Sequence, residues 1–335
     1  MRNRNRNGNG NTTRPRRVAA ASAVAGALLL SGCGLQSGNV VVQDFEPGSI
    51  GQGRPLEGVR LGVTSKEFSE QLILGQILAL SLTAAGAEVS DLTNIQGSMG
   101  SREAVKSGTA AVGYEYTGTG WINFLGHTEP IADPQKQWKA VRDEDLRNGL
   151  TWLPQSTLNN TYAMALNQAN ARKYGLRTLS DVAELAKRNP AAVTLCVENE
   201  FAVRGDGLRG MLAAYGVELP AANIKKMQTG LIYTEAAQGR TCTLGEVYTT
   251  DGRIGSMNLA VLKDDKRFFP NYNVAPVVNS QSLKRHPQLE PILNKITAEL
   301  DTRTAQRLNA KVDVEGQEPR DVAKEWLLEK GFIKE

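Results

Sequence analysis

Val59-Arg-Leu-Gly-Val-Thr-Ser65 is a short, mostly apolar stretch whose composition predicts a buried β-strand. It runs directly into residues 67–86, whose apolar side chains recur at helical spacing and predict a helix. Ser65 or Lys66 is therefore expected at the turn between the two elements. Strands that alternate with helices in this way are typical of α/β folds.

The same alternation continues along the rest of the chain. Further strands are predicted at 87–92, 110–116, 160–166, 193–197, 245–250 and 258–262. Further helices are predicted at 101–107, 121–125, 178–187 and 207–215, after Asp133-Pro134, and in two or three segments from Gln288 to Lys330. We expect largely parallel sheets in two lobes, because about 300 residues exceed what a single core usually serves.

The amino-terminal residues have the order of a secretory signal. Arginines at 14, 16 and 17 precede thirteen small or apolar residues (Val18 to Leu30), which are too few to span a bilayer. Leu30-Ser31-Gly32-Cys33 then resembles a bacterial lipobox, in which the cysteine is acylated. We expect 1–32 to be removed, Cys33 to carry lipid at the outer side of the cell membrane, and 33–55 to be a flexible tether. A plain signal peptide with a chance cysteine is the alternative.

The charge of the mature chain argues against nucleic acid as a partner. The full chain has 39 Lys and Arg against 35 Asp and Glu, but six of the arginines lie in residues 1–32. Removing them leaves 33 basic against 35 acidic residues, so no basic excess remains to bind phosphates.

Two cysteines remain after Cys33 is assigned to the lipid. Cys196 and Cys242 are an even pair in an oxidising compartment, which predicts one disulfide bond. Two separately buried thiols are the alternative.

Enzyme chemistry is not indicated by the sequence. The chain has only two histidines, His127 and His286, and it lacks H-E-x-x-H, C-x-x-C, G-x-S-x-G and Walker A motifs. We therefore expect no metal, no cofactor and no catalytic activity.

Four tyrosines stand beside small, turn-forming or hydroxyl residues rather than in apolar runs: Tyr116, Tyr162, Tyr248 and Tyr272. Any one of them alone is equally well an amphipathic residue at the edge of a core. Their surroundings are more specific. In chain order these are Ser65-Lys-Glu-Phe-Ser-Glu-Gln-Leu-Ile-Leu74, Tyr114–Gly120, Asn160-Thr-Tyr162, Glu200-Phe-Ala-Val-Arg-Gly-Asp-Gly207, Thr250-Asp-Gly-Arg-Ile254 and Leu262-Lys-Asp-Asp-Lys-Arg-Phe-Phe-Pro270.

Taken together, these motifs resemble the glycine betaine/choline/carnitine substrate-binding family of ABC osmoprotectant importers, over about residues 58–335. The resemblance implies a bilobal class II periplasmic-binding-protein fold, with two α/β lobes joined by two crossover segments. Lobe one would be 56–158 plus 273–335, and lobe two would be 159–272.

The resemblance also implies a site. Tyr116, Tyr162, Tyr248 and Tyr272 match the family's aromatic cage, which suits a trimethylammonium group because that cation has no N–H to donate. Four rings are worth very roughly 2–8 kcal/mol in total, whereas association costs about 4–15 kcal/mol, so the cage alone is marginal and a second anchor is expected. Lys66, Arg204 and Thr119 match a clamp for a ligand carboxylate. Asn160 stands where some betaine-binding members carry Asp, which removes a negative charge beside the cage.

The function implied is that of a monomeric, non-enzymatic receptor that delivers glycine betaine or a related betaine to an ABC permease. Choline or carnitine as the ligand is one alternative. A ligand-sensing partner of a membrane signalling protein is another.

Overall fold

The strand and helix expected after Val59 both form in the computed structural model, which describes residues 39–335. They are β3 (Arg60–Lys66) and α1 (Ser69–Ala84). Fourteen of the sixteen residues of α1 are buried. A helix that is covered on nearly all sides belongs to the core of a domain.

The first sheet has six strands among the described residues. Their spatial order is β1 (Asn39–Val40), β4 (Glu88–Ile95), β3, β5 (Val112–Tyr116), β12 (Val274–Asn279) and β6 (Leu150–Trp152). The pairs β3–β4 and β3–β5 are parallel, whereas β1, β12 and β6 join antiparallel. The sheet is therefore mixed rather than largely parallel, because β12 enters it from a distant part of the chain.

The second sheet has five strands in the described part of the chain. Their order is β11 (Leu259–Val261), β7 (Tyr162–Asn167), β10 (Leu244–Tyr248), β8 (Leu195–Val197) and β9 (Ile224–Lys226). This sheet is also mixed. The chain leaves the first sheet after β6 and returns to it at β12. The two connecting segments meet at an antiparallel bridge between Asn159 and Asn273.

Helices cover both faces of each sheet. Those of the first sheet are α1, α2 (Gly97–Lys106), the π-helix η1 (Thr119–Phe124), α3 (Pro134–Asp145), α10 (Ser280–Arg285), α11 (Leu289–Thr297), α12 (Thr302–Asp313) and α13 (Pro319–Glu329). Those of the second are α4 (Gln168–Tyr174), α5 (Leu179–Arg188), α6 (Asn199–Val203), α7 (Leu208–Tyr215), α8 (Thr229–Gln238) and α9 (Arg253–Ser256). Short 3-10 turns lie at Leu146–Asn148, Pro190–Ala192 and Ala221–Asn223.

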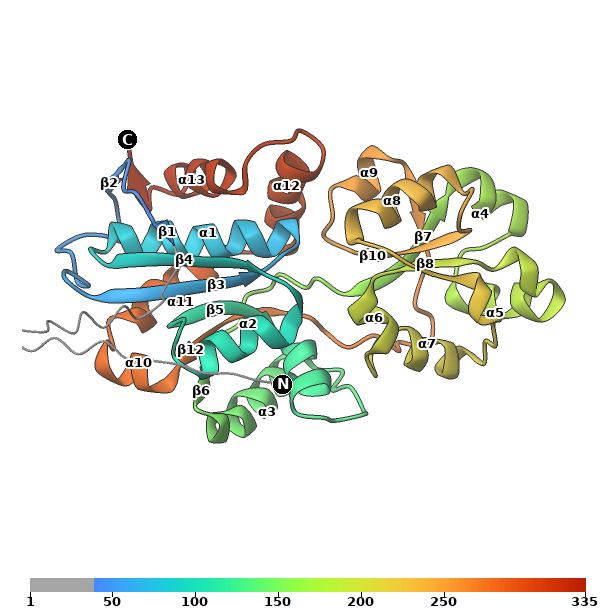
Figure 1. Ribbon diagram of the computed structural model, residues 1–335, viewed down its shortest axis with the longest axis horizontal. Helices are drawn as coiled ribbons and strands as arrows, with labels where there is room; N and C mark the ends of the chain where they lie inside the picture. The colour runs from blue at the N-terminus through green and yellow to red at the C-terminus, as the bar shows by residue number, and fades with distance from the viewer. Residues whose placement is uncertain (1–38) are drawn as a thin grey trace, which may run out of the picture. The chain divides into compact units, whose positions relative to one another are not determined.

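Alternation along the strands separates the cores. In β12, Val274 and Val278 join the large core that contains α1 and α13, while Ala275 and Val277 join a second core with α2 and α3. Figure 1 shows α1 lying along β3 and β4. The helix expected after Asp133-Pro134 forms as α3, with Pro134 in its first turn and the Asp133 carboxylate accepting from the Lys136 N–H.

Residues 39–55 differ from the expected tether. Val41, Phe45 and Ile50 are buried in the large core, and β2 (Glu46–Pro47) pairs with the carboxy-terminal strand β13 (Ile333–Lys334). This stretch is therefore folded onto the body, because its three apolar side chains find partners far along the chain. The expected signal peptide, the lipid site at Cys33 and the start of the tether lie outside the described residues.

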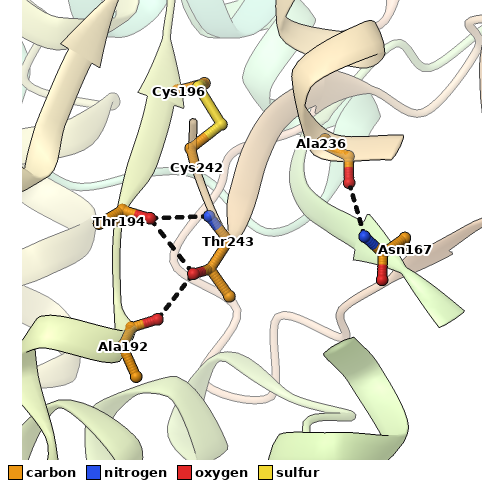
Figure 2. Close-up of a disulfide and its surroundings, with 7 residues drawn as sticks. All are labelled: Asn167, Ala192, Thr194, Cys196, Ala236, Cys242 and Thr243. Carbon is orange, nitrogen blue, oxygen red and sulfur yellow. Dashed lines mark hydrogen bonds between the residues drawn. A yellow bond between two sulfur atoms is a disulfide. The ribbon is translucent and has the colours of Figure 1, made fainter. Parts of the chain in front are cut away.

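The expected disulfide is present between Cys196 and Cys242, with Cα atoms 5.7 Å apart (Figure 2). It joins the middle of β8 to the segment just before β10, and the two strands are parallel neighbours. Beside it, the Thr243 N–H donates to the Thr194 hydroxyl at 2.8 Å. Within residues 39–335, none of the helices has the length and apolar content that crossing a membrane requires.

Candidate ligand-binding site

One cavity lies between elements of the two sheets. All eight residues that the sequence predicts for ligand contact line it: Lys66, Tyr116, Thr119, Asn160, Tyr162, Arg204, Tyr248 and Tyr272. Residues that the sequence analysis did not single out complete the wall: Glu67, Phe68, Gly97, Ser98, Glu198, Glu200 and Thr229. The structure thus brings the predicted set together around a single space.

Three of the tyrosines are held at one end of the second sheet and at the crossover. Tyr162 begins β7 and Tyr248 ends β10, and the antiparallel register places them opposite each other, with ring centroids 5.3 Å apart. Tyr272, on the segment that returns to β12, meets Tyr162 edge to face at 5.2 Å. The phenol of Tyr272 donates to Asp206 at 2.7 Å, which fixes the orientation of its ring.

The fourth tyrosine comes from the first sheet. Tyr116 ends β5, and its phenol donates to Glu70 at 2.8 Å. Phe68, at the start of α1, stacks on Tyr248 at 5.0 Å and lies 6.3 Å from Tyr116. Phe68 is therefore a fifth ring of the cavity. The only sequence signal for it was its place directly after Lys66 and Glu67 at the strand-to-helix turn.

Gly118, two residues after Tyr116, lies where the backbone passes close to Tyr272. A Cβ atom at this position would lie 2.7 Å from the Asn271 carbonyl oxygen and 2.7 Å from Cδ1 of Tyr272. Glycine thus allows the η1 segment to approach the Tyr272 ring closely.

Lys66 lies at the end of β3 and is almost fully buried. Its Nζ donates to Glu115 Oε1 at 2.7 Å and lies 4.9 Å from the centre of the Tyr116 ring. One of its three N–H bonds is used by Glu115, so the ammonium keeps donors for a second acceptor.

Arg204 follows α6 and is buried among carboxylates. Nε and Nη2 donate to the two oxygens of Asp206 at 2.7 and 2.6 Å, and Nη1 donates to Glu200 at 2.9 Å. Nη2 also reaches the Thr119 hydroxyl at 3.4 Å. Both cations of the expected carboxylate clamp are thus at the cavity, and both are paired with carboxylates of the chain. The charge around the cavity is not an excess of positive charge.

Asn160 precedes Tyr162 at the crossover. Its Nδ2 donates to Glu70 Oε1 at 2.9 Å, while its Oδ1 is buried and accepts no hydrogen bond within the described residues. From the sequence, Asn160 is expected to remove a negative charge from beside the cage. The structure shows a buried carboxyl group, Glu70, immediately behind it.

Burial keeps the tyrosines neutral. It raises the pKa of Tyr116, Tyr162, Tyr248 and Tyr272 well above the ordinary value of a phenol. The four rings therefore present neutral aromatic faces, and such faces attract cations through the ring quadrupole. No group of three or more His, Cys, Asp and Glu side chains that could hold a metal ion occurs in residues 39–335.

Residues 59–329 match a family described as the substrate binding domain of ABC-type glycine betaine transport systems. The glycine-betaine-binding protein of Pseudomonas aeruginosa is 40% identical over 278 residues, covering 82% of this chain and 88% of that protein. The carnitine transport binding protein OpuCC of Listeria monocytogenes is 32% identical, covering 92% and 94%. A crystal structure described as a glycine betaine/carnitine/choline ABC transporter is 31% identical with a TM-score of 0.65, covering 81% of this chain and 99% of that one.

Proposed function

Because the chain belongs to the family of substrate-binding domains of ABC-type glycine betaine transport systems, we propose that it captures glycine betaine or a closely related betaine. The ligand would be bound in the cavity between the two sheets and handed to an ABC permease. The protein would act outside the cytoplasmic membrane, as a receptor without catalytic activity.

The observation that carries the proposal is the set of aromatic rings. Tyrosines from β5, β7, β10 and the return crossover face one space, and two neighbouring pairs have centroids 5.2 and 5.3 Å apart. A quaternary ammonium is stabilised by such faces because they attract its charge and tolerate its methyl surface. Lys66 and Arg204 line the same cavity, and we propose that they bind the carboxylate of a betaine.

Contacts between the two sheets suggest how the ligand is retained. The Thr250 hydroxyl donates to Glu70 on α1, and the Ser98 N–H donates to Glu200 Oε2 at 2.8 Å. We propose that lobe one (56–158 plus 273–335) and lobe two (159–272) close on the ligand through such contacts. Ligand and closure would then stabilise each other, since a complete cage needs Tyr116 from lobe one together with the rings of lobe two.

Carnitine is a second candidate ligand. The Listeria relative is a carnitine transport binding protein, and the buried Asn160 Oδ1 would accept a hydrogen bond from the carnitine hydroxyl. Choline lacks the carboxylate that Lys66 and Arg204 would bind, so it is expected to bind more weakly than either. We also propose that Cys33 carries the lipid that holds a monomeric receptor near its permease.

Isothermal titration calorimetry of the purified protein with glycine betaine, carnitine and choline tests the proposal. Saturable binding of one carboxylated ligand per chain, with choline weaker, is expected. Absence of heat for all three ligands, together with an unchanged melting temperature, would refute it.

A further inference from the structure

Glu70 is a buried carboxyl group that the proposed ligand contacts leave unused. It lies in the first turn of α1 and is only 4% exposed. Four side chains donate to its two oxygens. Tyr116 Oη and Asn160 Nδ2 donate to Oε1 at 2.8 and 2.9 Å, while Thr250 Oγ1 and Asn309 Nδ2 donate to Oε2 at 2.5 and 3.0 Å.

This arrangement suits a carboxylate rather than a carboxylic acid. An ionised carboxyl group only accepts hydrogen bonds, and here two amide groups and two hydroxyls all donate to it. A protonated Glu70 would lose an acceptor position, and the Tyr116 or Thr250 hydroxyl would have to turn and accept its proton. Burial raises the pKa of Glu70 and the four donors oppose that rise. No Lys or Arg forms an ion pair with Glu70 within residues 39–335, so its negative charge is not locally neutralised by a cation.

The partners of Glu70 lie next to the cage in sequence as well as in space. Tyr116 is itself a cage ring. Asn160 stands two residues before Tyr162, and Thr250 stands two residues after Tyr248. One carboxylate therefore touches the three segments that carry three of the four tyrosines, and it joins the first sheet to the second through Thr250.

We propose that Glu70 is a positioning residue that gives the cage its preference for a cation. Its carboxylate accepts a hydrogen bond from the Tyr116 phenol, which makes that ring face more electron-rich, and it places a negative charge directly behind the cage. Asn160 itself carries no charge, but its amide donates to the Glu70 carboxylate. Asn160 therefore helps to hold that negative charge beside the cage. The inference rests on the proposed function.

The test compares glycine betaine with 3,3-dimethylbutanoate, which has the same shape but a neutral carbon in place of the nitrogen. Calorimetry measures Kd directly for betaine and by competition for the neutral isostere. In Glu70→Gln, the Kd of the isostere divided by the Kd of betaine is expected to fall about tenfold, because a nearby charge acts on the cation alone. The control Glu218→Gln removes the same charge from an exposed position and should leave the ratio unchanged.

A purely structural role for Glu70 would weaken both ligands equally and leave the ratio as in the wild type, which would overturn the inference. Thr250→Val removes the bond to the second sheet but keeps the charge, so it should weaken both ligands by the same factor. If Glu70→Gln shows no cooperative unfolding transition, Tyr116→Phe decides, since it keeps the ring and severs its bond to Glu70. In Tyr116→Phe the Kd of the isostere divided by the Kd of betaine should then fall, and an unchanged ratio refutes the inference. A wild type that binds neither ligand would refute the proposed function itself.

Discussion

Glu246 provides a stability prediction whose size follows from its burial. It lies on β10, two residues before Tyr248, and is 3% exposed. Its Oε2 accepts the Glu198 N–H at 2.8 Å. Burial, with Glu198 and Glu200 nearby and Arg204 only partly compensating, raises the pKa of Glu246 to about 8.

The direction and magnitude follow from proton linkage. The folded protein keeps the Glu246 proton up to a pH of about 8, whereas the unfolded chain releases it near 4.5. The unfolding free energy therefore falls as pH rises between these values, because the folded state binds more protons. A difference of roughly 3.5 pH units at about 1.4 kcal/mol per unit corresponds to a loss on the order of 5 kcal/mol, complete above pH 8.

Urea denaturation of the wild type and Glu246→Gln at pH 5 and pH 9 measures this effect. Glutamine keeps an oxygen for the Glu198 N–H but cannot ionise, so the variant should be similar to the wild type at pH 5 and several kcal/mol more stable at pH 9. Glu218→Gln, an exposed control, should follow the wild type at both values. Parallel pH profiles for the wild type and Glu246→Gln would show that this carboxyl group is not the source of the pH dependence.

Three further predictions follow from the same contacts. Replacing Cys196 and Cys242 by alanine should cost about 4 kcal/mol in guanidinium denaturation, since their bond closes a loop with a sequence separation of 46; an unchanged midpoint would contradict this. Tyr116→Ala and Tyr272→Ala should each weaken betaine binding by about 1–2 kcal/mol in calorimetry, and unchanged affinity in both would mean that the cage is misplaced. Gly118→Ala should displace the Tyr272 ring and weaken binding by about 1–3 kcal/mol, whereas wild-type affinity would show that the contact relaxes freely.

Much of the fold could be predicted because its signals are local. The strand at 60–66 and the helix after it could be predicted from apolar spacing, and the start of α3 from Pro134. The packing of residues 39–55 could not be predicted from the sequence. Val41, Phe45 and Ile50 are isolated among glycine and polar residues, so no period marks them, and their partners lie far along the chain.

Some residues of the candidate site could be predicted from the sequence, and others could not. The four tyrosines stand in distinctive motifs, so a resemblance could locate them. Glu70 could not be located, because an acid in the first turn of a helix usually faces solvent and favours the helix dipole. Its burial depends on Thr250 and Asn309, which only the tertiary structure brings to α1. The mixed character of the first sheet likewise depends on β12 returning from the second sheet.

A crystal structure of the protein with bound glycine betaine tests the proposed binding mode most directly. The trimethylammonium nitrogen should lie within about 6 Å of the ring centroids of Tyr116, Tyr162, Tyr248 and Tyr272. The ligand carboxylate should point toward Lys66 and Arg204. Betaine bound elsewhere, or with its carboxylate among the rings, would contradict it.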